Sequence, residues 1–166
     1  MTGHGGAAVK LKIVSGAQTG VDRGALDAAL DCGADCGGWC PERRLAEDGV
    51  VPDRYPVREL PGAGYVERTL ENVIDSDGTL IVYEKRYDSG TELTGEFCAE
   101  HDRPLLCLDL ALTTPAEAGR QVVEFIAGHG IAVLNVAGPR ASKWPQGREQ
   151  ARQVIAAALD AVASAP

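Results

Sequence analysis

A regular alternation of short apolar runs with stretches of helical periodicity constrains the fold of this chain most strongly. Apolar runs typical of strands lie at 11–15, 79–83, 104–108 and 131–136, with a shorter candidate at 36–40. Helical spacing of apolar residues covers 22–30, 65–75, 92–101, 115–127 and 145–163. Strands separated by helices pair in parallel through right-handed crossovers. We therefore predict an α/β, Rossmann-like three-layer sandwich with a mainly parallel sheet of five or slightly more strands.

Length and composition indicate one ligand-binding domain over residues 10–164, preceded by a glycine-rich tail, 1–9, that we expect to be disordered. No apolar run reaches the roughly 18 residues of a membrane span, and the N-terminus lacks the pattern of a signal peptide. The net charge of −8 disfavours nucleic acid as a partner. We expect a cytoplasmic protein that binds neither membrane nor nucleic acid.

The cysteine count is odd, which favours reduced thiols over disulfides. Cys98 and Cys107 fall in a helical and an apolar stretch, so both are expected in the core. Cys32, Cys36 and Cys40 lack the close pairing of structural zinc sites, and their role is left open.

The loop after the first predicted strand reads Ser-Gly-Ala-Gln-Thr-Gly at 15–20. Ligands of parallel sheets bind beyond the carboxyl ends of the strands, where such loops lie. Glycines let a ligand approach the backbone, and successive N–H groups at a helix start form an anion-binding concavity. The loop matches neither G-x-G-x-x-G nor a Walker A motif. It predicts a site for an anionic, phosphate-bearing ligand; the alternative is a tight turn without a ligand.

Three further loops carry side chains suited to the same ligand, at 37–49, 88–96 and 135–143. Each has a simpler alternative: a tryptophan in the core, a plain helix N-cap at Ser89 or Thr91, and a solvated basic turn. The candidate ligand-binding residues are Gly16, Gln18, Thr19, Gly20, Arg23, Trp39, Cys40, Asp48, Ser89, Gly90, Thr91, Gly138, Arg140, Ser142 and Lys143. No catalytic or metal-ligating residue is assigned.

Basic residues concentrate on these loops although the chain is acidic overall. The set consists of Arg23, Arg43, Arg44, Arg54, Lys85, Arg86, Arg140, Lys143 and Arg148. A basic mouth on an acidic protein would draw anions into a cleft. The histidines lie away from the loops, so no Ser-His-Asp arrangement is expected.

Several motifs, taken in order, resemble the molybdenum cofactor carrier family. They are residues 13–23, Gly37–Pro41 with Arg44, Ala46, Glu47, Asp48 and Gly49 after it, Asn72, Asp75, Ser76, Asp77, Gly90-Thr91 and 135–140. That family is Rossmann-like and belongs to the SLOG superfamily, with the lysine-decarboxylase-like phosphoribohydrolases. Ala17 stands where the family more often has glycine.

The resemblance implies a homo-oligomer, a dimer or tetramer, that binds molybdenum cofactor (phosphorylated molybdopterin). Such a protein stores or protects the cofactor for molybdoenzymes as acceptors. The alternative is a nucleotide-binding protein or a nucleoside monophosphate phosphoribohydrolase. Of the phosphoribohydrolase loop Pro-Gly-Gly-x-Gly-Thr-x-x-Glu, only Gly90-Thr91 and a later Glu92 or Glu96 are present, so a carrier is favoured over an enzyme. Whether the ligand is the intact cofactor, molybdate, phosphate or a nucleotide stays open.

Overall fold

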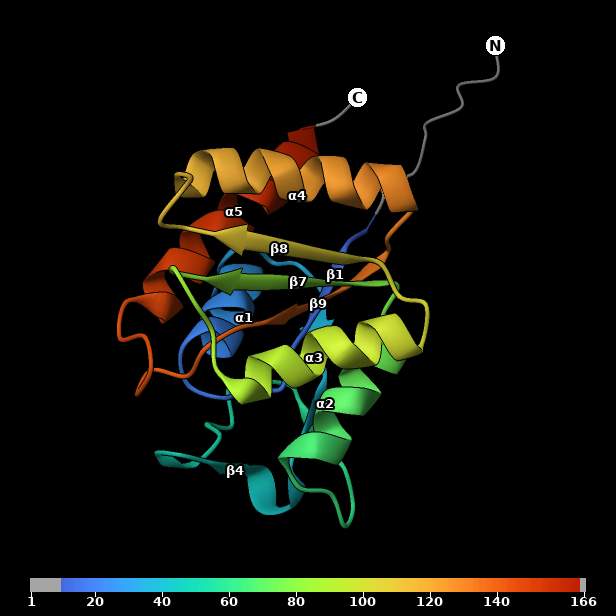
Figure 1. Cartoon of the computed structure of the whole chain (residues 1–166), viewed down its shortest axis with the longest axis vertical. Coiled ribbons are helices and arrows are strands. Elements are labelled where there is room, and N and C mark those ends of the chain that lie inside the picture. The colour runs from blue at the N-terminus through green and yellow to red at the C-terminus, as the bar shows by residue number, and fades with distance from the viewer. Residues whose placement is uncertain (1–9, 165–166) are drawn as a thin grey trace.

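The computed structural model describes residues 10–164, so the expected tail at 1–9 lies outside the described part. Five parallel strands form the main sheet (Figure 1). Their order is β2 (Cys36–Gly37), β1 (Lys12–Val14), β9 (Val133–Ala137), β7 (Gly78–Tyr83) and β8 (Leu105–Asp109). The predicted α/β fold with a parallel sheet is confirmed.

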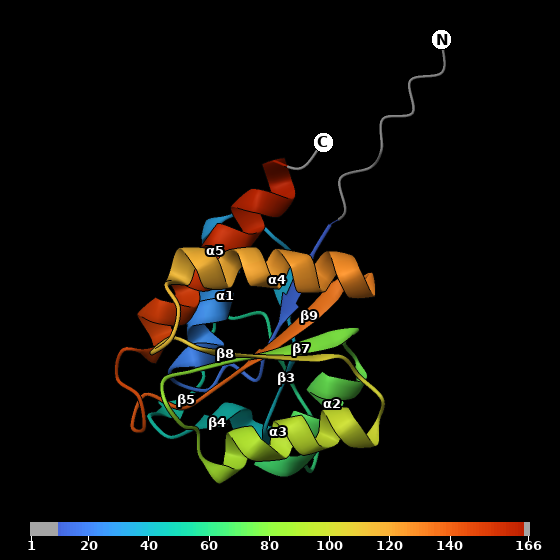
Figure 2. The same ribbon diagram turned by 45° about the horizontal axis from the view of Figure 1, so that its top comes forward.

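Helices cover both faces of the sheet, as Figure 2 shows most clearly. One face carries α1 (Val21–Asp31), α4 (Pro115–His129) and α5 (Gly147–Ser164), and the other carries α2 (Tyr65–Ile74) and α3 (Ser89–Glu100). The larger core lies under the first group, where Leu80 and Val82 of β7 meet Val154 and Ile155 of α5. Ile81 is also fully buried, so β7 is enclosed on both faces, as its unbroken apolar run predicts.

Helix ends follow local chemistry. Thr114 caps α4 by accepting a hydrogen bond from the Glu117 N–H (3.2 Å), and Pro115 opens the first turn. Gly130 ends this helix in the left-handed conformation, with φ 63°. The helix predicted over 115–127 is found, and it runs two residues further. The N-cap of α3 is Asp88 rather than Ser89 or Thr91, and α3 begins three residues earlier than the pattern indicated.

The segment 41–61 contains short ordered elements. A 3₁₀ turn (Glu42–Arg44) precedes a hairpin of β4 (Leu45–Ala46) and β5 (Gly49–Val50), and β6 (Arg58–Glu59) pairs with β3 (Trp39–Cys40). The predicted strand at 36–40 is thus divided at Gly38, whose φ is 128° and whose Cβ would lie 2.1 Å from the Ser15 carbonyl oxygen. A second, small core underlies this segment and consists of Ala17, Leu26, Cys40, Ala46, Val51, Tyr55 and Val57.

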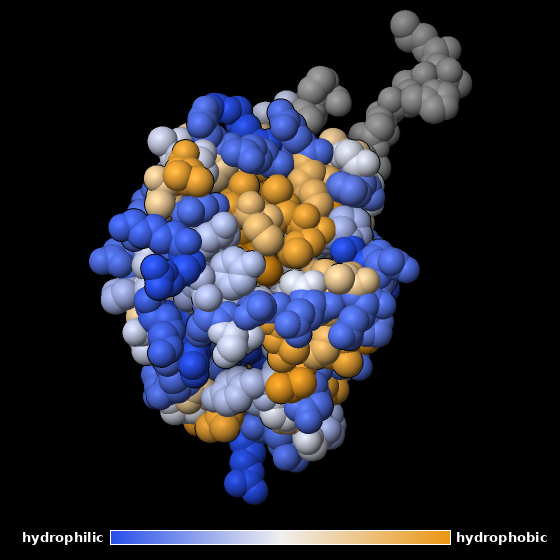
Figure 3. Space-filling model, in the orientation of Figure 1, coloured by the Kyte–Doolittle hydropathy of each residue, from blue (hydrophilic) through white to orange (hydrophobic). Residues whose placement is uncertain are grey.

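Strand β8 forms one edge of the sheet, and this placement explains a wrong prediction. Cys98 of α3 is buried as expected, but Cys107 is exposed, because α3 does not cover the outer part of β8. Leu105 on the same face is 38% exposed. Apolar side chains gather on the surface over β8 (Figure 3). Among the described residues, no helix is both long and apolar enough to cross a membrane.

The contact between α1 and α5 depends on a glycine. A Cβ at Gly24 would lie 2.1 Å from the backbone oxygen of Arg148. We predict that Gly24→Ala lowers the free energy of unfolding by about 1–3 kcal/mol, because backbone cannot yield as a side chain can. Gly128→Ala in α4 is the matched control, since nothing lies within 4 Å of its Cβ position. This control should stabilise the protein by about 0.5–1 kcal/mol. Urea unfolding checks both, and equal effects would contradict the packing described.

Candidate functional site

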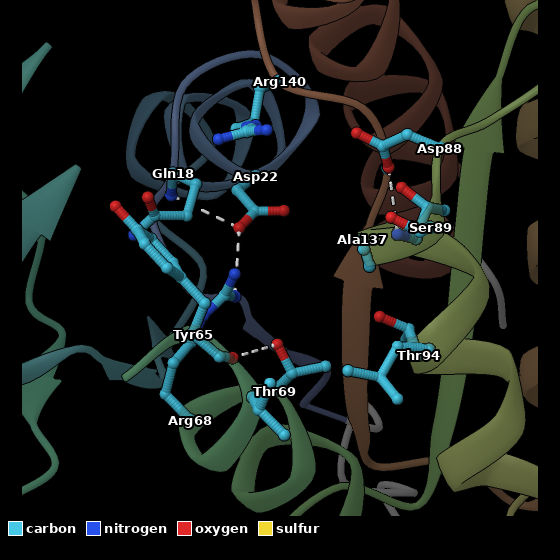
Figure 4. A pocket seen from close by; sticks show the side chains of 15 residues that line it. Gln18, Asp22, Tyr65, Arg68, Thr69, Asp88, Ser89, Thr94, Ala137 and Arg140 are labelled. Carbon is cyan, nitrogen blue, oxygen red and sulfur yellow. Dashed lines mark hydrogen bonds and ion pairs between the residues drawn. The ribbon is translucent and has the colours of Figure 1, made fainter. Parts of the chain in front are cut away.

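A cavity of about 240 Å³ lies at the carboxyl ends of β1, β7 and β9 (Figure 4). The loop after β1, the start of α3 and the loop after β9 form three of its walls, and α2 forms the fourth. Its lining residues are Gln18, Asp22, Tyr65, Val66, Arg68, Thr69, Asp88, Ser89, Gly90, Thr91, Leu93, Thr94, Ala137, Gly138 and Arg140. The position is the one at which parallel sheets bind ligands.

Arg68 is the principal cation of the cavity floor. Its side chain is 15% exposed and makes one ion pair within residues 10–164, a 3.6 Å contact between its Nη1 and Asp22 Oδ2. Its Nε is buried without a hydrogen-bond partner. Gly16 gives the guanidinium its space, because a Cβ there would lie 1.9 Å from Nη1. Burial lowers the pKa of Arg68, although Asp22 opposes this shift. A buried guanidinium with so few partners can donate charge-assisted hydrogen bonds to a ligand oxygen.

Asp22 occupies the position that the glycine-rich loop was expected to offer to a ligand. The Gln18 N–H donates to Asp22 Oδ2 (3.3 Å), and the Ala17 N–H donates to Ser15 Oγ (3.1 Å). Burial raises the pKa of Asp22 to about 6, although Arg68, the Gln18 N–H and Arg23 oppose this shift. The loop is therefore organised around an internal carboxylate, and Figure 4 shows this carboxylate facing the cavity.

The first turn of α3 forms the wall opposite Asp22. Asp88 Oδ1 accepts a hydrogen bond from the Thr91 N–H (3.1 Å), which caps the helix. Ser89, Gly90 and Thr91 line the cavity at the positive end of the helix dipole. The loop after β9 comes close because Gly138 has no side chain, since a Cβ there would lie 2.3 Å from the Val82 carbonyl oxygen. Three segments distant in sequence thus meet around one space.

Glu47 joins two of the ligand-side loops beside the cavity. It accepts hydrogen bonds from the Thr19 hydroxyl and from the Ser142 hydroxyl (2.6 Å) and N–H (3.2 Å). Hydrogen bonds from Ser142 and Thr19 hold the pKa of Glu47 below its usual value. Arg140 Nε lies 3.9 Å from Glu47 Oε2. Thr19 and Ser142 are therefore engaged with Glu47, whereas Arg140 also lines the cavity.

Several residues of the predicted basic mouth are engaged by internal partners. Arg23 is buried and forms a bidentate pair with Asp48 at 2.5 and 2.9 Å. Arg54 and Arg148 both pair with Asp27, and Arg44 donates only to backbone carbonyls. Of the nine basic residues expected around a ligand, only Arg140 lines the cavity. Counting basic residues on the loops overestimated the positive charge at the site, because carboxylates from other segments pair with several of these residues.

The structure divides the fifteen candidate residues between several places. Gln18, Ser89, Gly90, Thr91, Gly138 and Arg140 line the cavity, with Gly16 behind Arg68. Gly20 packs on the loop after β9, where a Cβ would lie 2.5 Å from the Pro139 carbonyl oxygen. Cys40 is in the small core. The Trp39 indole N–H donates a hydrogen bond to Asp75 Oδ2 in a separate hollow, and Lys143 lines another.

The residues missed by sequence reasoning come mainly from α2. Tyr65, Val66, Arg68 and Thr69 reach the cavity from the helix before β7, which the search of strand-to-helix loops did not include. No local signal distinguishes Arg68 from other helical arginines. Asp22 did carry a signal, since an acid in the first turn of a helix next to a glycine loop finds free N–H groups. Among residues 10–164, no three His, Cys, Asp or Glu side chains are grouped to hold a metal ion.

The raised pKa of Asp22 makes a prediction for stability. A carboxyl whose pKa rises from 3.8 unfolded to about 6 folded favours the folded state below pH 3.8 and loses that contribution as the pH passes 6. The loss is on the order of 3 kcal/mol. Asp22→Asn removes the titration, so its stability relative to wild type should be higher at pH 8 than at pH 4. Urea unfolding of both proteins at the two pH values checks this, and a pH-independent difference would contradict it.

Comparison with known proteins adds the family. Residues 13–159 match the circularly permutated YpsA SLOG family. A crystal structure named "Putative molybdenum carrier protein", from Syntrophus aciditrophicus SB, is 41% identical, with a TM-score of 0.87. The match covers 92% of this chain and 96% of that one. No curated protein matches significantly. The chain belongs to the circularly permutated YpsA SLOG family.

Proposed function

We propose that the cavity binds a phosphorylated small molecule, and that this ligand is molybdenum cofactor, held for storage or protection rather than turnover. The observation that carries the proposal is the guanidinium of Arg68, which lies on the cavity floor with a single long ion pair. The name of the 41% identical structure supports the choice of a molybdenum-containing cargo. The family resemblance extends the proposal to a cytoplasmic homo-oligomer that transfers cofactor to molybdoenzymes.

The electrostatics of the cavity favour a monoanionic or dianionic group near its mouth. Arg140 reaches the cavity from the loop after β9, and its side chain is 43% exposed, so it can move toward a ligand. The helix dipole of α3 adds partial positive charge at Ser89–Thr91. A phosphate between these groups would receive charge-assisted hydrogen bonds from both.

The placement of the acids supports binding over hydrolysis. Glycosidic cleavage needs a carboxyl group placed to protonate or activate the reacting atoms. Glu92 and Glu96, the acids proposed for that reaction, do not line the cavity, and Asp48 is paired with Arg23. Asp88 caps α3 and Asp22 is held by the glycine-rich loop. A phosphoribohydrolase activity is therefore the weaker of the two candidate functions.

Cavity volume limits how much of the ligand is enclosed. At about 240 Å³ the cavity lies below the roughly 300–1,000 Å³ of sites that bury a drug-sized molecule. One ring system or one phosphate fits inside, and the rest of a cofactor of this size lies at the mouth. This geometry suits a carrier, because a part left outside is accessible to an acceptor.

Arg68→Gln tests the proposal. We predict that wild type binds purified molybdenum cofactor in an equilibrium titration, and that Arg68→Gln weakens binding about 10- to 100-fold through loss of charge-assisted hydrogen bonds. Arg120→Gln is the matched control, because Arg120 lies on α4 and pairs with Glu117 on the surface. Its affinity should equal that of wild type. The proposed function would be rejected if wild type did not bind molybdenum cofactor. The proposed site would be rejected if Arg68→Gln and Arg120→Gln bound it equally well.

A further inference from the structure

We infer that the cavity floor selects a nitrogen heterocycle carrying a ring N–H beside a carbonyl, the lactam edge found in pterins and guanine, through Asp22 and Arg68. The phosphate of the same ligand then points outward to Arg140 and the first turn of α3. The inference rests on the proposed function and deepens it, because it assigns an orientation and a ring chemistry to the ligand.

The floor presents an acceptor directly beside a donor. Asp22 Oδ2 is engaged by the Gln18 N–H and lies 3.6 Å from Arg68 Nη1. In Figure 4 Asp22 Oδ1 points across the cavity toward the side of Ala137 and Ser89. A ligand edge that donates to Oδ1 and accepts from the neighbouring guanidinium complements this pair. A lactam has this arrangement, with its N–H next to its C=O.

Two more polar atoms of the same residues lack partners. Gln18 Oε1 is a buried acceptor without a donor, and Arg68 Nε is a buried donor without an acceptor. Buried polar groups without partners are costly, so this part of the site is strongly polar before a ligand binds. A single oxyanion, being an acceptor only, does not complement the Asp22 carboxylate on the same floor.

A phosphate is unsuited to the floor but suited to the mouth. At the floor it would lie against the Asp22 carboxylate, which is 6% exposed, and like charges with little water between them repel strongly. At the mouth it meets Arg140 and the N-terminal turn of α3 instead. Tyr65, Val66, Leu93 and Ala137 add apolar surface to the cavity lining, which a flat ring can contact.

Asp22→Asn is a sharp probe because Gln18 fixes the orientation of the new amide. The Gln18 N–H requires an acceptor at the position of Oδ2, so the amide oxygen takes that place. The amide nitrogen, a donor, then replaces Oδ1 in the cavity. The variant thus presents a donor to a ligand N–H, with little change in shape.

The experiment compares guanosine monophosphate with ribose 5-phosphate, which has the phosphate but no ring, by isothermal titration. We expect wild type to bind guanosine monophosphate at least about tenfold more tightly than ribose 5-phosphate. Asp22→Asn should remove this preference by weakening the binding of guanosine monophosphate. Glu117→Gln on α4, an exposed acid remote from the cavity, should behave as wild type.

Three results would overturn the inference. Equal binding of both ligands by wild type would show that the floor does not recognise the ring. Tighter binding of ribose 5-phosphate by Asp22→Asn would place the phosphate on the floor. If wild type bound neither ligand, the inference would also be rejected. The titration with molybdenum cofactor tests the proposed function separately.

Discussion

The buried carboxylate of Asp22 organises the site. It accepts a hydrogen bond from the Gln18 N–H of the glycine-rich loop and pairs with Arg68 of α2 on the cavity floor. The pair links a loop at the end of β1 to a helix that the chain reaches more than forty residues later. Its cost is visible in the raised pKa of Asp22 and the lowered pKa of Arg68, both caused by burial. A pair of this kind is retained more often for specificity than for stability, in keeping with its place on a cavity floor.

Much of the fold was predictable because its signals are local. The apolar run at 79–83 predicted strand β7, and the helical spacing over 115–127 predicted α4. The strand-to-helix loops also indicated where the cavity lies, since parallel strands bring their carboxyl ends together. What was not predictable depends on long-range packing. Arg68 reaches the cavity only because α2 crosses the sheet there and Gly16 leaves room for its guanidinium.

Of the sequence signals, the positions of the basic residues predicted the composition of the site least well. The position of a basic residue on a ligand-side loop places its backbone near the site. The partners of its side chain determine whether its charge is available to a ligand. Asp27 pairs with Arg54 and Arg148, and Asp48 pairs with Arg23. The pairs made by Arg54 and Asp48 attach the segment 41–61 to the rest of the domain. The glycine-rich loop shows the same effect with opposite sign, because its N–H groups bind Asp22 and Ser15 Oγ internally. A phosphate-binding loop and a carboxylate-binding loop share one sequence pattern, and only the neighbouring residues distinguish them.

We expect the ligand to contact Arg68 in the cavity beyond β1, β7 and β9. Diffraction from crystals of the complex with molybdenum cofactor, recorded at the molybdenum absorption edge, tests this contact most directly. We predict an anomalous peak at the cavity mouth, with the attached ligand density continuing to Arg68 on the floor. A peak in the hollow beside Trp39 and Arg58, or beside Lys143, with an empty cavity would contradict it.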